Sequence, residues 1–122
     1  ITDAGQYHAA LTSHLAKAGN ELDIFFEEGE KPPLPKALSV KSFSLVVHRE
    51  RGDKKTLDFE CAPAEERPQG EKEGTCSHFV AKATWMDPLE TLKVNGDIQV
   101  AGQALKVSWL NFVPKKFAHH EE

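Results

Sequence analysis

The chain has 122 residues, of which 39% are hydrophobic and 28% are charged, a composition typical of one globular domain and not of a disordered segment. Its net charge of -4 argues against the strongly basic surface that nucleic-acid-binding proteins use. No apolar run approaches the roughly 18 residues that a transmembrane helix needs, so we expect no transmembrane segment.

Residues 5–18 fit two patterns. At a period of two, the odd-numbered residues from Tyr7 to Leu15 share one face of a strand; at a period of 3.6, Tyr7, Leu11 and Leu15 form a helical stripe. The next segment, 21–27, alternates as a strand, and Ala18-Gly19-Asn20 fits a hairpin turn between the two. We favour a strand at 5–18, because the rest of the chain has the character of β-structure.

The middle of the chain predicts a second hairpin. Residues 28–39 contain three prolines and a glycine, which indicates a loop or a crossing between sheets. Segments 40–49 and 55–61 both alternate between apolar and polar residues, and the polar turn 51–54 joins them. The hydrophilic residues 62–75 then predict a long loop.

The last third of the chain predicts one further strand and a closing hairpin. Segment 77–85 alternates, and Asp87-Pro88 is expected to begin a short helical turn or an irregular crossing. Asn95-Gly96 predicts a turn. Segment 97–112 then contains two alternating runs that flank Ala101-Gly102-Gln103, which is typical of a β-hairpin.

Together these segments predict an all-β domain of about seven strands with turn signals roughly every 8–12 residues, the pattern of an Ig-like antiparallel β-sandwich. A small β-barrel is the rival architecture. The domain is expected to span residues 1–113, with 114–122 as a polar tail. The side chains expected in the core are Phe43, Leu45, Val47, Leu57, Phe59, Phe79, Trp85, Val107 and Trp109.

The segments Gly5-Gln-Tyr-His-Ala-Ala-Leu11 and Gly19-Asn-Glu-Leu-Asp-Ile-Phe-Phe26 resemble the opening hairpin of small periplasmic Ig-like domains. Such domains occur in heavy-metal efflux adaptors and in exported bacterial proteins, and the closing hairpin at 97–109 is similar as well. These domains often carry a His-Gly-Gly element before the first strand, where this chain reads Thr2-Asp3-Ala4-Gly5. The resemblance implies an extracytoplasmic β-sandwich, in the periplasm or cell envelope, with a binding or assembly role.

The two cysteines support two competing hypotheses. If strands 55–61 and 77–85 pair across the loop between them, Cys61 and Cys76 lie at its base and a disulfide bond is expected there. Alternatively, Cys76 and His78 share a strand face and bind copper or zinc, with Cys61, His48 and Met86 completing the site. The sequence does not decide between the two.

The end of the chain offers a second, weaker metal site. His119 and His120 precede two glutamates, and short histidine-rich segments bind transition metals loosely. His8 and His14 lie six residues apart, roughly 20 Å along a strand, so they cannot chelate one ion as a pair within that strand.

No nucleophile elbow or phosphate-binding glycine loop is present, so we expect no enzymatic activity and no resident cofactor. The favoured hypothesis is a non-catalytic binding or assembly module of the bacterial cell envelope with a protein partner. The alternatives are a periplasmic copper- or zinc-binding protein and a carrier of a small apolar ligand in a barrel cavity lined by Phe and Trp. The oligomeric state stays open.

Overall fold

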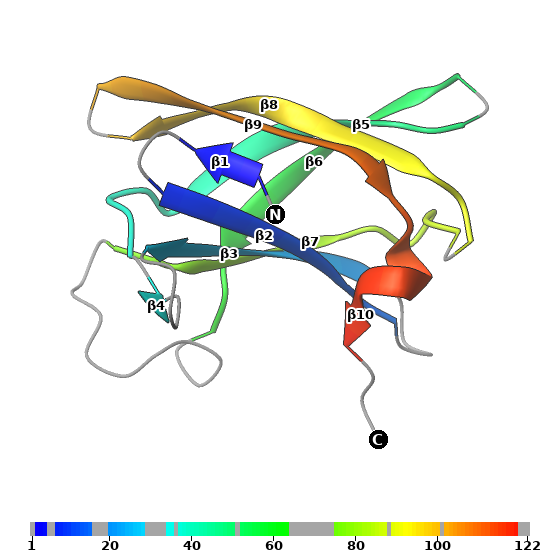
Figure 1. Ribbon diagram of the computed structural model, residues 1–122, viewed down its shortest axis with the longest axis horizontal. Helices are drawn as coiled ribbons and strands as arrows, with labels where there is room; N and C mark the ends of the chain where they lie inside the picture. Colours follow the sequence, from blue (N-terminus) through cyan, green and yellow to red (C-terminus); the bar gives the residue numbers. More distant parts are fainter. Residues whose placement is uncertain are drawn as a thin grey trace.

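The computed structural model describes residues 2–4, 7–15, 20–28, 34–35, 37–50, 52–63, 75–87, 89–100 and 102–119. Strands dominate these residues, together with one short 3₁₀ helix, η2 (Figure 1). The elements are β1 (Thr2–Ala4), β2 (Tyr7–His14), β3 (Glu21–Glu28), β4 (Leu34–Pro35), β5 (Ser42–His48), β6 (Lys54–Cys61), β7 (His78–Lys82), β8 (Leu92–Val100), β9 (Gln103–Phe112), η2 (Pro114–Phe117) and β10 (Ala118–His119).

The strands form one continuous sheet that curls back on itself. Its hydrogen-bonded order is β1-β2-β3-β7-β6-β5-β8-β9, and every neighbouring pair along this path is antiparallel. The two ends of this order, β1 and β9, lie beside each other, so the sheet is nearly closed (Figure 1). The predicted all-β class is confirmed, and the near-closure gives the domain a barrel-like form.

Two strand predictions are confirmed by the pairing. Residues 7–14 form strand β2 and not a helix, and residues 8–14 pair with β3. The predicted second hairpin is also present, because β5 and β6 pair from Ser42↔Glu60 to His48↔Lys54. A backbone hydrogen bond of 2.9 Å from Arg49 N to the Asp53 carbonyl closes its turn.

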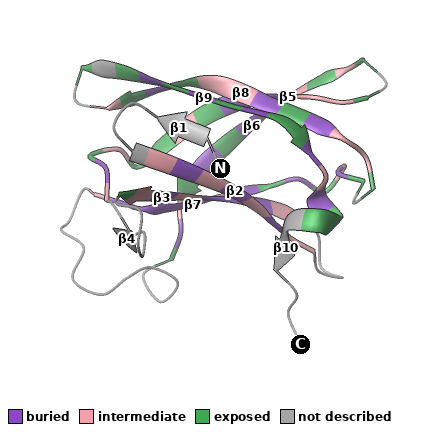
Figure 2. Ribbon diagram, in the orientation of Figure 1, coloured by how far each residue is buried: buried purple, intermediate pink, exposed green. Residues whose placement is uncertain are grey.

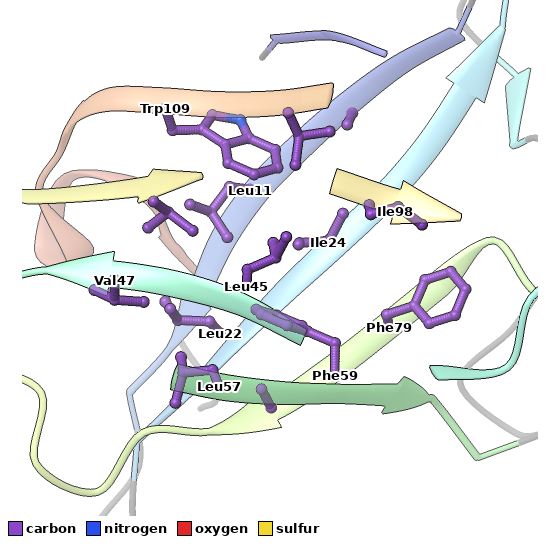
Figure 3. Close-up of a cluster of buried hydrophobic side chains, with 14 of the residues drawn as sticks. Leu11, Leu22, Ile24, Leu45, Val47, Leu57, Phe59, Phe79, Ile98 and Trp109 are labelled. Carbon is purple, nitrogen blue, oxygen red and sulfur yellow. The ribbon is translucent and has the colours of Figure 1, made fainter. Parts of the chain in front are cut away.

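The core lies between the two facing layers of the curled sheet (Figures 2 and 3). Seven of the nine side chains predicted to point inward are buried, and Phe43 and Trp85 are partly buried against the cluster. Four phenylalanine rings from β3, β5, β6 and β7 pack on one another, with centroids 4.8 to 6.3 Å apart. They are Phe26, Phe43, Phe59 and Phe79.

The predicted turn at Asn95-Gly96 is wrong, because both residues lie inside the nine-residue strand β8. There β8 pairs with β5, with Asn95 opposite Val46. A Cβ atom added to Gly96 would lie 2.7 Å from Leu45 Cδ2. Glycine is therefore required here for the close approach of two strands, and not for a reversal of the chain.

Gly96→Ala should lower the free energy of unfolding by about 1–3 kcal/mol, because the new methyl group overlaps the buried Leu45 side chain. Urea unfolding of the single and double variants checks this. Leu45→Ala removes the obstructing atoms, so the loss caused by Gly96→Ala should be smaller in that background. Equal losses in both backgrounds would contradict the proposed overlap.

Two further boundaries differ from the prediction. The strand expected at 77–85 ends at Lys82, and a turn at 84–85 carries Trp85. The first part of the predicted tail is packed against the domain: Pro114 is buried, and its carbonyl accepts a 2.5 Å hydrogen bond from Ser13 Oγ. β10 then pairs in parallel with the end of β2.

Among the described residues, no helix has the length and apolar character that crossing a membrane would require.

Candidate functional site

The two cysteines form a disulfide bond. Their Cα atoms are 6.0 Å apart, Cys61 ends β6, and Cys76 is fully buried. A bend at Ser77 separates Cys76 from β7. Cys76 instead pairs with Leu38 through two backbone hydrogen bonds of 2.8 and 2.9 Å. A sulfur atom in this bond is not a thiolate ligand.

The structure also separates the other residues of the predicted cysteine–histidine metal site. His48 lies at the far end of β5 from Lys41, whose carbonyl accepts a hydrogen bond from Cys61 N. Seven residues of extended chain span roughly 23 Å, so His48 is remote from both cysteines. The combined site of Cys76, His78, His48 and Met86 is therefore not formed.

Met86 is also remote from Cys76, because the two residues lie near opposite ends of β3. Its backbone N donates to the Ala83 carbonyl, and Ala83 N donates to Asn20 at the start of β3. Cys76 lies near the other end of that strand, next to the contact between Phe26 N and the Ser77 carbonyl. The Met86 side chain is buried in the hydrophobic core.

The two histidines of the predicted tail metal site, His119 and His120, differ in what the structure describes of them. His120 lies outside the described residues. The backbone of His119 belongs to β10, where it is the register partner of His14 on β2. The predicted tail site therefore stays a prediction, but its first residue lies beside a strand that carries another histidine.

A different group of possible ligands lies on the outer face of the β2–β3 hairpin. Inward positions on β2 alternate with outward ones, and His14 belongs to the outward set. Its register partner across the hairpin is Glu21, and Asp23 follows on the same face of β3, two residues further along. The antiparallel register thus makes His14 a direct neighbour of Glu21 and a diagonal neighbour of Asp23.

The ligand atoms of this group converge. One atom each from His14, Glu21 and Asp23 lies within 4.8 Å of the other two. The His14 Nδ1 and Glu21 Oε1 atoms are 3.8 Å apart, and these two side chains are 25% and 30% exposed. The group therefore has a solvent-facing side at His14 and Glu21, and we call these three residues the hairpin cluster.

Asp23 is the buried member of the hairpin cluster. Its side chain is only 8% exposed although it points away from the core, and its Oδ1 atom makes no hydrogen bond among the described residues. A buried carboxylate oxygen without a hydrogen bond is costly, because no hydrogen bond replaces the hydration that it has lost. A bound cation is one means of offsetting that cost.

A second histidine, which is buried, lies beside Asp23 on the adjacent strand. The register pairs His78 with Phe25, so His78 is a diagonal neighbour of Asp23 across β3 and β7. Its Nε2 atom is 3.8 Å from Asp23 Oδ1. Its ring stacks on the Phe25 ring, with centroids 4.1 Å apart and an interplanar angle of 21°.

One imidazole and two carboxylates suit a divalent first-row transition ion. Imidazole nitrogen and carboxylate oxygen both bind zinc at about 2.0–2.2 Å, and three protein ligands leave a position for water or another ligand. Tetrahedral ligands at that length lie roughly 3.4 Å from one another. Small side-chain rotations would bring the cluster from 4.8 Å to that spacing.

The predicted carrier of a small apolar ligand is not supported by the described part of the interior. The packed phenylalanine rings occupy the space between the layers where such a ligand was expected. A cleft of about 740 Å³ lies outside the core at the end of β5, but no large apolar side chain lines it. Its lining includes His48, Arg49, Glu50, Lys93 and Asn95.

Arg49, which lines this cleft, makes structural contacts with three other side chains. Its Nε atom lies 3.1 Å from Glu90 Oε1, a second guanidinium nitrogen lies 3.5 Å from Asp53 Oδ2, and the guanidinium carbon lies 5.4 Å from the centroid of the Trp85 ring. These contacts tie the β5–β6 turn to the connection before β8. We therefore assign the cleft no ligand.

The sequence contains no direct signal for the hairpin cluster. A three-residue turn at 18–20 would place His14 opposite Ile24, because paired residues of a hairpin are equally distant from its turn. The observed register instead pairs His14 with Glu21, so the predicted turn could not have located the cluster.

No protein family, curated protein or solved structure matches this chain, so the proposals that follow are argued from its own residues and geometry.

Proposed function

We propose that this domain is a non-catalytic binding module that acts outside the cytoplasm and binds a divalent transition ion at the hairpin cluster. The observation that carries the proposal is the convergence of His14, Glu21 and Asp23 within 4.8 Å, with the Asp23 carboxylate buried and its Oδ1 atom without a hydrogen bond among the described residues. The disulfide bond supports the extracytoplasmic location, because such bonds persist in oxidising compartments.

The ion is expected to be zinc or copper in preference to calcium or magnesium. Calcium requires six to eight oxygen ligands, and magnesium keeps most of its water. The hairpin cluster supplies only three ligand groups, and one of them is nitrogen. Imidazole therefore biases the site toward the transition ions.

Metal-free protein should bind one Zn(II) per chain, and Asp23→Asn should abolish this binding. Asparagine keeps the size of the side chain but removes the negative charge. Calorimetry with ZnCl₂ after treatment with a chelator measures the stoichiometry and affinity. At a free zinc concentration of 100 times Kd, the folded state should gain about 2.7 kcal/mol, which a rise in melting temperature reports.

The matched control is Asp97→Asn, which makes the same chemical change at an exposed residue of β8 and should leave binding unchanged. The double variant His119→Ala/His120→Ala tests the tail. If zinc binding survives Asp23→Asn but is lost in the tail variant, the tail is the site and the proposal fails. Absence of stoichiometric binding in the unaltered protein would also overturn it.

A further inference from the structure

We infer that His78 is a positioning residue for the proposed metal site and that it acts through Asp23. This inference rests on the proposed function and adds a fourth residue from a third strand. The four side chains project from the same face of β2, β3 and β7, with Asp23 in the middle. His14 and Glu21 lie on one side of it, and His78 lies on the other.

The geometry separates His78 from the ligands themselves. His78 Nε2 is 3.8 Å from Asp23 Oδ1, whereas the group of atoms that converge within 4.8 Å consists of His14, Glu21 and Asp23. The 3.8 Å separation of Nε2 from Oδ1 is longer than a hydrogen bond, and neither atom makes one among the described residues. A shift of either side chain by about 1 Å or less would let Nε2 donate to one carboxylate oxygen while the other oxygen faces the ion. Ligating carboxylates in metal sites commonly have such outer partners, which orient them.

His78 is held in place by its surroundings. Its side chain is only 9% exposed, and the stacking contact with Phe25 fixes the plane of the ring from the neighbouring strand. The Ala62 backbone N also donates a 2.9 Å hydrogen bond to the His78 carbonyl, which anchors the start of β7. A ring held in this way can hold Asp23 in one orientation before the ion arrives.

The His78 imidazole should strengthen metal binding at the hairpin cluster. Without the imidazole, Asp23 would lose the group that orients it, so the ion would bind more weakly and in a less uniform geometry. Loss of such outer partners typically weakens metal binding by about ten- to a hundredfold. The size of the loss depends on a hydrogen-bond donor at the position of Nε2, and not on the volume of the ring.

Calorimetry with ZnCl₂ on three variants of the full chain tests this inference. His78→Leu, which removes the donor, should raise Kd by about ten- to a hundredfold. His78→Gln, whose amide nitrogen reaches about as far as Nε2, should retain most of the affinity. His48→Leu, the control on a remote strand, should bind zinc as the unaltered protein does.

Cobalt(II) provides a second readout, because its visible absorption reports the ligand geometry. His78→Leu should change the cobalt spectrum, while His48→Leu should not. If His78→Leu does not fold, His78→Asn, whose amide is too short to reach Asp23, replaces it in every comparison.

The outcomes separate the two proposals. If the unaltered protein binds no zinc, the proposed function fails and the role of His78 fails with it. If zinc binds in an Asp23-dependent manner but His78→Leu changes neither Kd nor the cobalt spectrum, only the inference about His78 is overturned. Equal losses in His78→Leu and His78→Gln would likewise show that the ring fills space and does not orient Asp23.

Discussion

Replacing Phe79 with alanine should lower the free energy of unfolding by about 3–5 kcal/mol. The ring is fully buried and lies where β7 joins the two halves of the sheet. Its centroid is 4.8 Å from that of Phe43 and 5.7 Å from that of Phe26. The substitution therefore removes apolar contacts with two other strands and leaves a cavity that the surrounding rings cannot fill.

Urea unfolding followed by far-ultraviolet circular dichroism measures this loss. Leu110→Ala is the control, since Leu110 is a large apolar residue that is 60% exposed, and its truncation should change stability by less than about 0.5 kcal/mol. A Phe79→Ala variant as stable as the Leu110→Ala variant would mean that the four-ring cluster does not form the core.

Removing the disulfide bond should lower stability by about 3 kcal/mol. The bond closes a loop with a sequence separation of 15 residues, and the loss of this constraint raises the conformational entropy of the unfolded chain. The variant Cys61→Ala/Cys76→Ala should still fold, because a chain of 122 residues buries a core that does not depend on a covalent link.

Intact mass before and after reduction establishes the bond, with an expected difference of two hydrogen atoms. Unfolding in urea, with and without reductant, then gives its contribution. The reductant should destabilise the unaltered protein and leave the double alanine variant unchanged. Two freely alkylating thiols in the oxidised protein would refute the bond and the argument for an extracytoplasmic location.

The alternation of apolar residues predicted most of the strands because one face of each is buried. Leu45 and Val47 on β5, and Leu57 and Phe59 on β6, occupy the inward positions that a period of two assigns to them. Local patterns of this kind are read from neighbouring residues alone. The disulfide bond could also be considered from the sequence, as one of two hypotheses for the cysteines, because both cysteines lie at the base of one predicted loop.

Features that depend on contacts between distant segments were not predicted. Asn95-Gly96 has the sequence of a turn, yet the approach of β5 determines its conformation. Pro114 follows the last long strand as a tail would, but Ser13, 101 residues away, holds it. Neither contact can be predicted from the local sequence alone.

The hairpin cluster was missed because charged residues on a strand usually indicate a solvated face. Asp23 alternates with Leu22 and Ile24 as a solvent-facing residue would, but its side chain is buried. His78 is a neighbour of Asp23 only because β3 pairs with β7, and the two residues lie 55 positions apart in the chain. Neither burial nor that pairing follows from periodicity.

The short strands β1 and β10 bear on the tendency of this domain to aggregate. Both pair with the same edge of β2: β1 with residues 7–9, and β10 with Ser13 and His14. Exposed strand edges are templates on which further chains can add by backbone hydrogen bonding. Because this edge is occupied at both ends, only Ala10–Thr12 lie between the two pairings, a stretch shorter than most strands. We therefore expect β2 to be a poor template for edge-to-edge association, so the domain should tolerate high concentration while its near-closed sheet stays intact.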